Sequence, residues 1–316
     1  MKTIIKKAGY FLVLLSLAAC ESFDFNQEMG QKTICIISDN DLVYTGMHDL
    51  NQTESTGYIS INCGGSRYID KDVDVTLEYA PDALSQYNKI KYDIDESKYA
   101  KMLSPEYYSI SHLGVTLKAS SPDTYNVMPI QVKPEGLSPD SVYFIPLRIK
   151  GVSAYSVNPD KNQVLYQIQM KNLYARTDEA TIYNASGKLQ KEGESEREAA
   201  ASQTFHPLTK NSFRIFAGIK GYEKNEETIK KNAIIVIVNE DNNLTMKPYN
   251  EDYIEIASID PEKPNYYGNY ELSDVYGGKK RQRFNFKYKY RFKGDSKWET
   301  VDMRSLRNVT LDLIDK

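Results

Sequence analysis

The segment that most constrains the fold is Phe284–Phe292, in which every even position is aromatic and every odd position is polar. Successive side chains of a β-strand point to opposite faces of the sheet, so this pattern predicts a strand with one fully aromatic face in the core. A turn over residues 293–297 returns the chain into Trp298–Met303. The end of the chain is therefore predicted to form an antiparallel hairpin.

Short β-rich segments bounded by turn residues recur through the first half of the chain. Val73–Tyr79 alternates best, with an apolar residue at every second position, as in a strand that has one buried face. The alternation is lost after Pro81, where helix formers predict a short helix, and Glu96–Leu103 is predicted to form another. The predicted strands are residues 32–38, 42–47, 57–63, 73–80, 113–119, 126–133, 142–150 and 163–172. Their number and spacing fit an immunoglobulin-like sandwich.

A second β region follows a break near residues 173–180. Strands are predicted at Phe213–Ile219 and Ala233–Val238, and a hairpin turn follows at residues 239–243. The polar insertion Lys188–Ser202 lacks a hydrophobic face, so it is predicted to be a solvated loop or a short exposed helix.

The predicted fold class is all-β with two domains. An immunoglobulin-like β-sandwich is expected over residues 31–173, and a second antiparallel sandwich or barrel over residues 178–316.

The N-terminus has the pattern of an export signal. Lys2, Lys6 and Lys7 precede the apolar run Phe11–Leu15, which is too short for a stable transmembrane helix. The following Leu17-Ala18-Ala19-Cys20 matches a lipobox. We therefore expect residues 1–19 to be a lipoprotein signal peptide, Cys20 to be acylated, and residues 20–30 to form a tether. The alternative is ordinary secretory cleavage with an incidental Cys20.

Composition limits the partners. Removing residues 1–19 takes away three Lys and no acidic residue, which leaves 37 basic and 43 acidic residues, or a net charge of −6. This acidity argues against a nucleic-acid or anionic-membrane partner, so the expected membrane contact is through the lipid anchor only. Cys35 and Cys63 are the remaining cysteines. They are interpreted as two buried free thiols in preference to a disulfide.

Recognisable catalytic motifs are absent from the sequence. His48, His112 and His206 are isolated from one another, and there is no nucleophile elbow, phosphate-binding glycine loop or zincin motif. The pattern therefore predicts no enzyme activity, no cofactor and no metal. Acidic pairs such as Asp70 and Asp74 keep a glycosidase open as an alternative, although a solvated strand face is favoured. The basic cluster Lys279–Arg283 follows two glycines and is predicted to be a solvated hairpin tip.

Two places combine aromatic rings with hydrogen-bonding groups, as non-catalytic sugar binding requires. One is a turn-like segment with three Tyr and two Asn: Asn265, Tyr266, Tyr267, Asn269 and Tyr270. The other is Trp298, which by alternation shares a polar face with Thr300 and Asp302 while Val301 and Met303 face the core. Both groups are candidate glycan-binding residues. The competing interpretation is ordinary packing.

Several segments resemble a known family. The strand Tyr143–Ile149, with its Y-x-x-P-L-x-I pattern, and its neighbours Gly114–Leu117 and Val164–Ile168 resemble the N-terminal domain of Bacteroidetes surface lipoproteins. These lipoproteins are encoded beside SusC/SusD-type transporters. Tyr267–Tyr270, together with the final hairpin, resembles their C-terminal domain.

The resemblance implies a SusE-position protein of a polysaccharide utilisation locus, lipid-anchored in the outer membrane and facing the cell exterior, with a periplasm-facing anchor as the alternative. Its implied function is to bind a glycan without catalysis and to pass oligosaccharide to a SusC/SusD-type transporter complex. Alternatives from other classes are a structural or adhesive lipoprotein that binds a protein partner, and a glycoside hydrolase with an unrecognised site.

Overall fold

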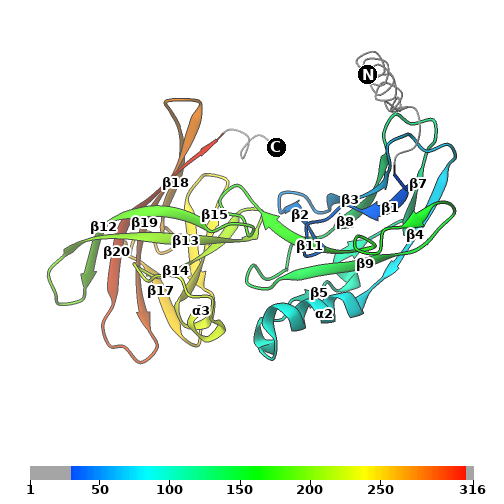
Figure 1. Ribbon diagram of the computed structural model, residues 1–316. Coiled ribbons are helices and arrows are strands. Elements are labelled where there is room, and N and C mark those ends of the chain that lie inside the picture. The colour runs from blue at the N-terminus through cyan, green and yellow to red at the C-terminus, as the bar shows by residue number, and fades with distance from the viewer. Residues whose placement is uncertain (1–29, 311–316) are drawn as a thin grey trace, which may run out of the picture.

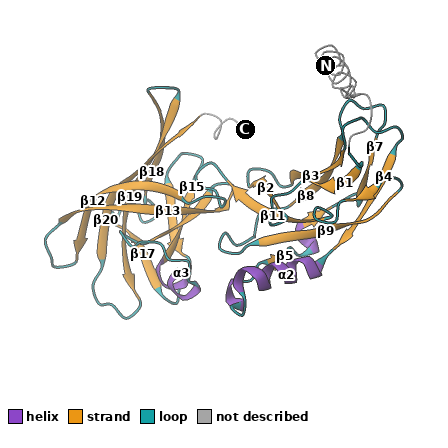
Figure 2. Cartoon of the chain, in the orientation of Figure 1, coloured by secondary structure: helices purple, strands orange, loops and turns teal. Residues whose placement is uncertain are grey.

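The computed structural model describes residues 30–310, and the expected signal peptide, Cys20 and most of the tether lie outside this range. Strands dominate (Figure 2), and two α-helices occur within the described range: α2 (Pro81–Tyr92) and α3 (Glu226–Asn232). Figure 1 shows two β-rich bodies joined end to end. The N-terminal body contains β1 to β11 and the C-terminal body contains β12 to β20. The predicted all-β fold class is confirmed.

The N-terminal body is a sandwich of two sheets around one core. The first sheet has the order β10-β1-β3-β8-β6, and the second has the order β2-β11-β9-β4-β7, with β5 added beside β9. The first sheet contains β1 (Thr33–Ile36), β3 (Ser55–Gly64), β6 (Tyr108–Ser109), β8 (Tyr125–Val132) and β10 (Ser156–Val157). The second contains β2 (Val43–Asp49), β4 (Val73–Tyr79), β5 (Lys101–Met102), β7 (Gly114–Leu117), β9 (Tyr143–Val152) and β11 (Gln163–Lys171). All eight strands predicted for this half are present.

Alternation explains why these strands pack as they do. In β4, Val73, Val75 and Leu77 are buried while Asp74 and Thr76 face solvent. Burying each such side chain contributes roughly 1.5–3 kcal/mol. The two helices predicted after β4 are only partly confirmed. Helix α2 begins at Pro81 as expected, but Glu96–Leu103 forms a single 3₁₀ turn followed by β5. The chain is drawn into β5 because Lys101 and Leu103 donate backbone hydrogen bonds to the β9 side of the sheet.

One buried polar contact depends on two glycines. The hydroxyl of Tyr166 lies 3.0 Å from Nε2 of His48, and neither side chain is exposed. A Cβ atom at Gly46 or Gly57 would come within 2 Å of that hydroxyl, at 1.9 and 1.7 Å. Glycine is therefore required at both positions so that the strands can close over the tyrosine ring.

The C-terminal body is one strongly curled antiparallel sheet of nine strands. Its order is β16-β15-β14-β13-β12-β20-β19-β17, with β18 also paired to β19. The strands are β12 (Thr181–Lys191), β13 (Arg197–Thr209), β14 (Ser212–Phe216), β15 (Ala233–Val238), β16 (Leu244–Pro248), β17 (Ile254–Ser258), β18 (Gly268–Val275), β19 (Lys279–Phe292) and β20 (Glu299–Thr310). Phe284, Phe286 and Tyr288 of β19 are fully buried inside the curl, which confirms the predicted aromatic face.

Two predictions for this body were wrong in detail. Lys188–Ser202 is neither a loop nor a helix, because most of it belongs to the β12–β13 hairpin with its turn near Glu192–Glu196. Apart from the buried Leu189 its side chains are small, polar or charged, and it is held in the sheet because β12 pairs with β20 and β13 pairs with β12. Lys279–Arg283 is not a hairpin tip but the start of β19, and the turn lies just before it, at Tyr276–Gly278.

The two bodies meet at a buried ion pair. Arg214 of β14 is fully buried and donates two 2.6 Å hydrogen bonds to the carboxylate of Asp140, which precedes β9 in the other body. Tyr222 donates a third bond to Asp140, at 3.1 Å. Burial alone would raise the pKa of Asp140, but the hydrogen bonds and charge of Arg214 outweigh it and hold this pKa below its ordinary value.

Candidate functional site

Trp298 lies where the sequence predicts it, on the outer polar face of the C-terminal sheet. It directly precedes β20, in which Val301 and Met303 are buried and Asp302 is exposed. The register aligns Thr300 with Lys289 and Glu299 with Tyr290 of β19. The outer side chains of β19 therefore lie beside the indole ring.

Two cations contact the Trp298 ring. The ammonium nitrogen of Lys289 lies 5.2 Å from the ring centroid, and the guanidinium carbon of Arg291 lies 4.7 Å from it. Both distances are within the range of favourable cation–π contacts. The indole is half-buried, so the cationic side chains support the ring while part of it stays open to solvent.

A carboxylate fixes this cationic support in place. Glu255 of β17 accepts hydrogen bonds from Arg291 Nε at 2.7 Å and from Lys293 Nζ at 2.8 Å. These partners, Lys293 first and Arg291 next, hold the pKa of Glu255 below its usual range. Glu255 is therefore ionised at neutral pH and orients the guanidinium beneath the indole.

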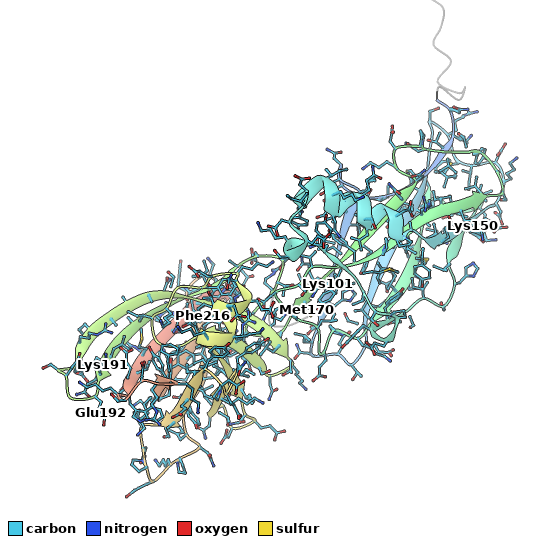
Figure 3. The ribbon with its side chains drawn as sticks, turned by 90° about the horizontal axis from the view of Figure 1, so that it is seen from below. Lys101, Lys150, Met170, Lys191, Glu192 and Phe216 are labelled. Atoms are coloured by element: carbon cyan, nitrogen blue, oxygen red, sulfur yellow. The ribbon has the colours of Figure 1, made fainter. Side chains whose placement is uncertain are left out.

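The β12–β13 hairpin anchors the backbone of Trp298. Glu192 donates its backbone N–H to the carbonyl of Trp298 at 2.8 Å, and the Glu192 carboxylate accepts from the Trp298 N–H at 3.2 Å. Figure 3 shows Glu192 at the end of the C-terminal body farthest from the N-terminal body. The indole is thus held at the distal end of the molecule.

Two of the tyrosines that the sequence predicts as glycan-binding residues are buried in the structure. Tyr267 is 9% exposed and Tyr270 is 6% exposed, and both belong to the aromatic core. The ring of Tyr270 packs 4.8 Å from Phe284 and 5.3 Å from Tyr174, because β18 pairs with β19 and brings Tyr270 opposite Phe284. Because both rings are buried in the core, Tyr267 and Tyr270 are packing residues, and the prediction that they are glycan platforms is wrong.

The remaining members of this segment lie near the sheet edge. Asn265 is exposed, and Tyr266 is half-buried with the Lys263 ammonium 5.9 Å from its ring. The carbonyl of Tyr266 accepts a 2.9 Å hydrogen bond from the Ser258 hydroxyl, which ties this loop to the end of β17.

Asn269 belongs to a polar ladder on the outer face. Its amide donates to Glu271 at 3.0 Å and its carbonyl accepts from Asn285 at 3.2 Å, while Arg283 donates to Glu271 at 3.0 Å. Asn269 is level with Asn285, six residues along β19 from Arg291. At about 3.4 Å per residue, the ladder and Trp298 are roughly 20 Å apart on the same face. The structure therefore separates the two predicted groups.

Sequence reasoning missed Lys289, Arg291 and Glu255 as neighbours of Trp298. The alternation of β19 does place its odd residues outward. The cross-strand register, which the sequence does not specify, decides which of them meet the indole.

The cysteine and histidine side chains show no catalytic arrangement among residues 30–310. Cys35 and Cys63 form no disulfide, and they point to opposite faces because Cys63 is level with Ile34 in the adjacent strand. Burial lowers the pKa of His48 and of His206 to about 4, so both rings are neutral at pH 7. Within the described range, no three His, Cys, Asp or Glu side chains form a metal-binding group. Neither described α-helix is long and apolar enough to cross a membrane.

An open surface depression of about 330 Å³ lies beside α3. It is lined by Lys220, Glu227, Thr228, Lys231, Asn232 and Tyr253. The rim is mixed in charge and offers only one aromatic ring, so it gives less support for sugar stacking than the surface around Trp298.

Two family models match successive parts of the chain. One, described as an N-terminal domain, matches residues 30–156, and the other, described as a C-terminal domain, matches residues 162–304. No curated protein matches the chain in sequence.

Solved structures share the whole fold at low sequence identity. A Bacteroides ovatus protein of unknown function is 18% identical with a TM-score of 0.67, over 89% of this chain and 96% of its own. A Bacteroides ovatus multidomain protein that includes a domain of unknown function is 18% identical with a TM-score of 0.64, over 90% and 97%. An auxiliary nutrient binding protein from Bacteroides thetaiotaomicron is 14% identical with a TM-score of 0.59, over 88% and 95%. Together with the two domain matches, these similarities show that the chain shares its two-domain fold with Bacteroides proteins.

Proposed function

We propose that this chain is a lipid-anchored outer-membrane protein, facing the cell exterior, that binds a glycan without cleaving it. The observation that carries the proposal is the Trp298 surface, a half-buried indole supported by Lys289 and Arg291 at the distal end of the C-terminal body. A half-buried aromatic ring on a polar sheet face suits the apolar side of a sugar ring, and the cations beside it suit the hydroxyl groups.

The side chains around the indole supply hydrogen bonds of both kinds. Lys289 carries three N–H donors, and Thr300, beside it in register, carries a hydroxyl that both donates and accepts. Gln190 pairs with Thr300 from the neighbouring strand β12 and adds an amide. Contacts to one or two sugars of this kind yield dissociation constants of roughly micromolar to millimolar, or about −8 to −4 kcal/mol. Such weak binding suits capture followed by release.

Two carboxylates near the ring, those of Glu255 and Glu299, are poorly suited to hydrolysis. Glycosidases need a carboxylic acid whose pKa is raised so that it can protonate the leaving oxygen. Glu255 instead has a lowered pKa because Lys293 and Arg291 bind it. Glu299 is bound to Tyr290 at 2.8 Å and to Arg197 at 2.8 Å. Both acids are committed to structural partners, which favours binding without cleavage.

The structural similarity to an auxiliary nutrient binding protein supports a role in nutrient capture. The distal position of Trp298 agrees with this role if Cys20 is the lipid anchor, because the C-terminal body would then project away from the membrane. We propose that captured oligosaccharide passes to a SusC/SusD-type transporter complex. Asn265, Tyr266 and Asn269 are kept as secondary glycan contacts on the same body.

A glycan array followed by product analysis tests this function. Residues 21–316 should bind at least one oligosaccharide on an array of plant, microbial and host glycans. Incubating the protein with that oligosaccharide overnight should leave its chromatographic profile unchanged. Binding with release of shorter products would make the protein a hydrolase. Binding to no glycan on the array would favour the structural or adhesive alternative.

A further inference from the structure

The outward side of β1, β3 and β8 in the N-terminal body has an unusual composition. We call it the tyrosine face. No outward position of these three strands carries a charged side chain, although 26% of the chain is charged. Tyr58 and Tyr125 are 49% and 51% exposed, and Val127 and Ile37 are also exposed. This is an open, uncharged sheet surface with two accessible aromatic rings.

The other sheet of the same sandwich does carry charged side chains on its outward side, so the lack of charge is specific to the tyrosine face. Its outward side carries Asp74, Glu78 and Arg148, with Arg148 paired to Asp82 at 2.6 Å. Figure 1 shows α2 beside that sheet, on the side of the body away from β1, β3 and β8. Charges border the tyrosine face where β8 ends, in the Lys133–Glu54 pair at 3.5 Å, and beside β1, where Lys161 interacts with Cys35.

The tyrosine face mixes rings with hydrogen-bonding groups. Tyr125 is level with Asn62, and Tyr58 lies four residues further along β3, so the two rings are about 13 Å apart along the strand. Ser60 lies between them on the same side. At the far end, the side-chain carbonyl of Gln131 accepts a 2.9 Å hydrogen bond from Thr56, and the same amide carries two N–H donors. Apolar rings and neutral donors thus alternate along one line.

We propose that the tyrosine face is a second binding surface, and that its ligand is a neutral oligosaccharide several sugars long. The absence of charge argues against an anionic glycan and against an anionic lipid surface, both of which need Lys or Arg. The alternation of rings with hydroxyl and amide groups matches a sugar chain, which presents apolar faces and hydroxyls in turn. The separation of Tyr58 and Tyr125 requires a chain long enough to contact both.

The inference rests on the proposed glycan-binding function but uses residues in the other body. Two surfaces on one protein raise the effective concentration of a long polymer at the second surface once the first is occupied. The chain would therefore retain a polysaccharide better than either surface retains a short fragment.

Isothermal titration calorimetry in the Trp298→Ala background tests the tyrosine face directly. The probes are maltohexaose, cellohexaose, xylohexaose and mannohexaose, with the corresponding disaccharides as length controls and hexagalacturonate as the charged control. The test variant is Tyr58→Ala/Tyr125→Ala, whose side chains lie outside the core. The matched control is Tyr276→Ala, a fully exposed tyrosine in the C-terminal body.

The expected result is that at least one neutral hexasaccharide binds, that its disaccharide binds much more weakly, and that the double variant weakens hexasaccharide binding at least tenfold. Tyr276→Ala should have no effect. Unchanged affinity in the folded double variant, or binding of hexagalacturonate alone, would overturn this inference and leave the proposed function standing. A change in sedimentation coefficient without a change in sugar affinity would assign the face to a second copy of the chain. Failure of the wild-type protein to bind any array glycan would instead refute the proposed function itself.

Discussion

Replacing Asp140 should strongly destabilise the protein, because it leaves a buried guanidinium without its partner. Arg214 is fully buried, and both of its terminal nitrogens donate to Asp140 at 2.6 Å, while its Nε has no hydrogen-bond partner within the described residues. Removing one member of a buried pair typically costs 3–5 kcal/mol. The Asp140 side chain is 19% exposed, so water partly compensates. We expect Asp140→Ala to lower the free energy of unfolding by about 3 kcal/mol.

Urea denaturation measures this loss with two probes. The chain contains one tryptophan, Trp298, so its fluorescence follows the C-terminal body, while far-ultraviolet circular dichroism follows both bodies. Asp140→Ala should lower the fluorescence midpoint and separate it from the circular dichroism midpoint, because Asp140 couples the two bodies.

Two controls isolate the unpaired charge. The double variant Asp140→Ala/Arg214→Met removes both charges and should cost less than Asp140→Ala alone. Asp95→Ala breaks the exposed pair with Lys98, which solvent screens, and should cost far less stability than Asp140→Ala. An Asp140→Ala variant as stable as Asp95→Ala would refute the claim that the junction depends on this buried pair.

Two further predictions concern acid stability and anchoring. Burial lowers the pKa of His48 and His206 to about 4 from an ordinary value of 6.5, so between these pH values the unfolded chain binds more protons than the folded chain. The free energy of unfolding should therefore fall as the pH drops from 6.5 to 4, by up to about 3 kcal/mol per histidine. Below pH 4 these two groups should cause no further loss. Urea midpoints measured from pH 7.5 to pH 4 test this, and His206→Asn should flatten the profile, whereas an unchanged profile in that variant would exclude His206 as a source. Mass spectrometry of the membrane fraction should show an acylated Cys20 at the mature N-terminus, and Cys20→Ala should release the protein from the membrane; a mature N-terminus at another residue would contradict lipidation.

Local pattern predicted much of the fold because the strongest strands carry their own signal. The aromatic alternation of Phe284–Phe292 and the apolar alternation of Val73–Tyr79 each specify a buried face without reference to the rest of the chain. The β12–β13 hairpin escaped prediction because its outer strand is built from residues such as Ala199, Ala200 and Ser202, which have no local apolar face. The hairpin forms because β12 pairs with this strand on one side and with β20 on the other.

The candidate site was predicted only as far as one strand can specify it. The outward placement of Trp298 follows from Val301 and Met303, but its contacts with Lys289 and Arg291 depend on register. Tyr270 was misplaced for the same reason, since pairing with Phe284 buries it. The Asp140–Arg214 pair joins residues 74 positions apart, and nothing in either local sequence identifies the partner.

The central claim is that Trp298 is the main platform of a non-catalytic glycan site, and calorimetry of one variant tests it most directly. Residues 21–316 are titrated with the best oligosaccharide from the array, alongside Trp298→Ala and the control Tyr68→Ala, an exposed tyrosine of the N-terminal body. Trp298→Ala should weaken binding at least tenfold, a loss of about 1.4 kcal/mol, while Tyr68→Ala binds as wild type does. Unchanged affinity in a folded Trp298→Ala variant would contradict the assignment of this surface.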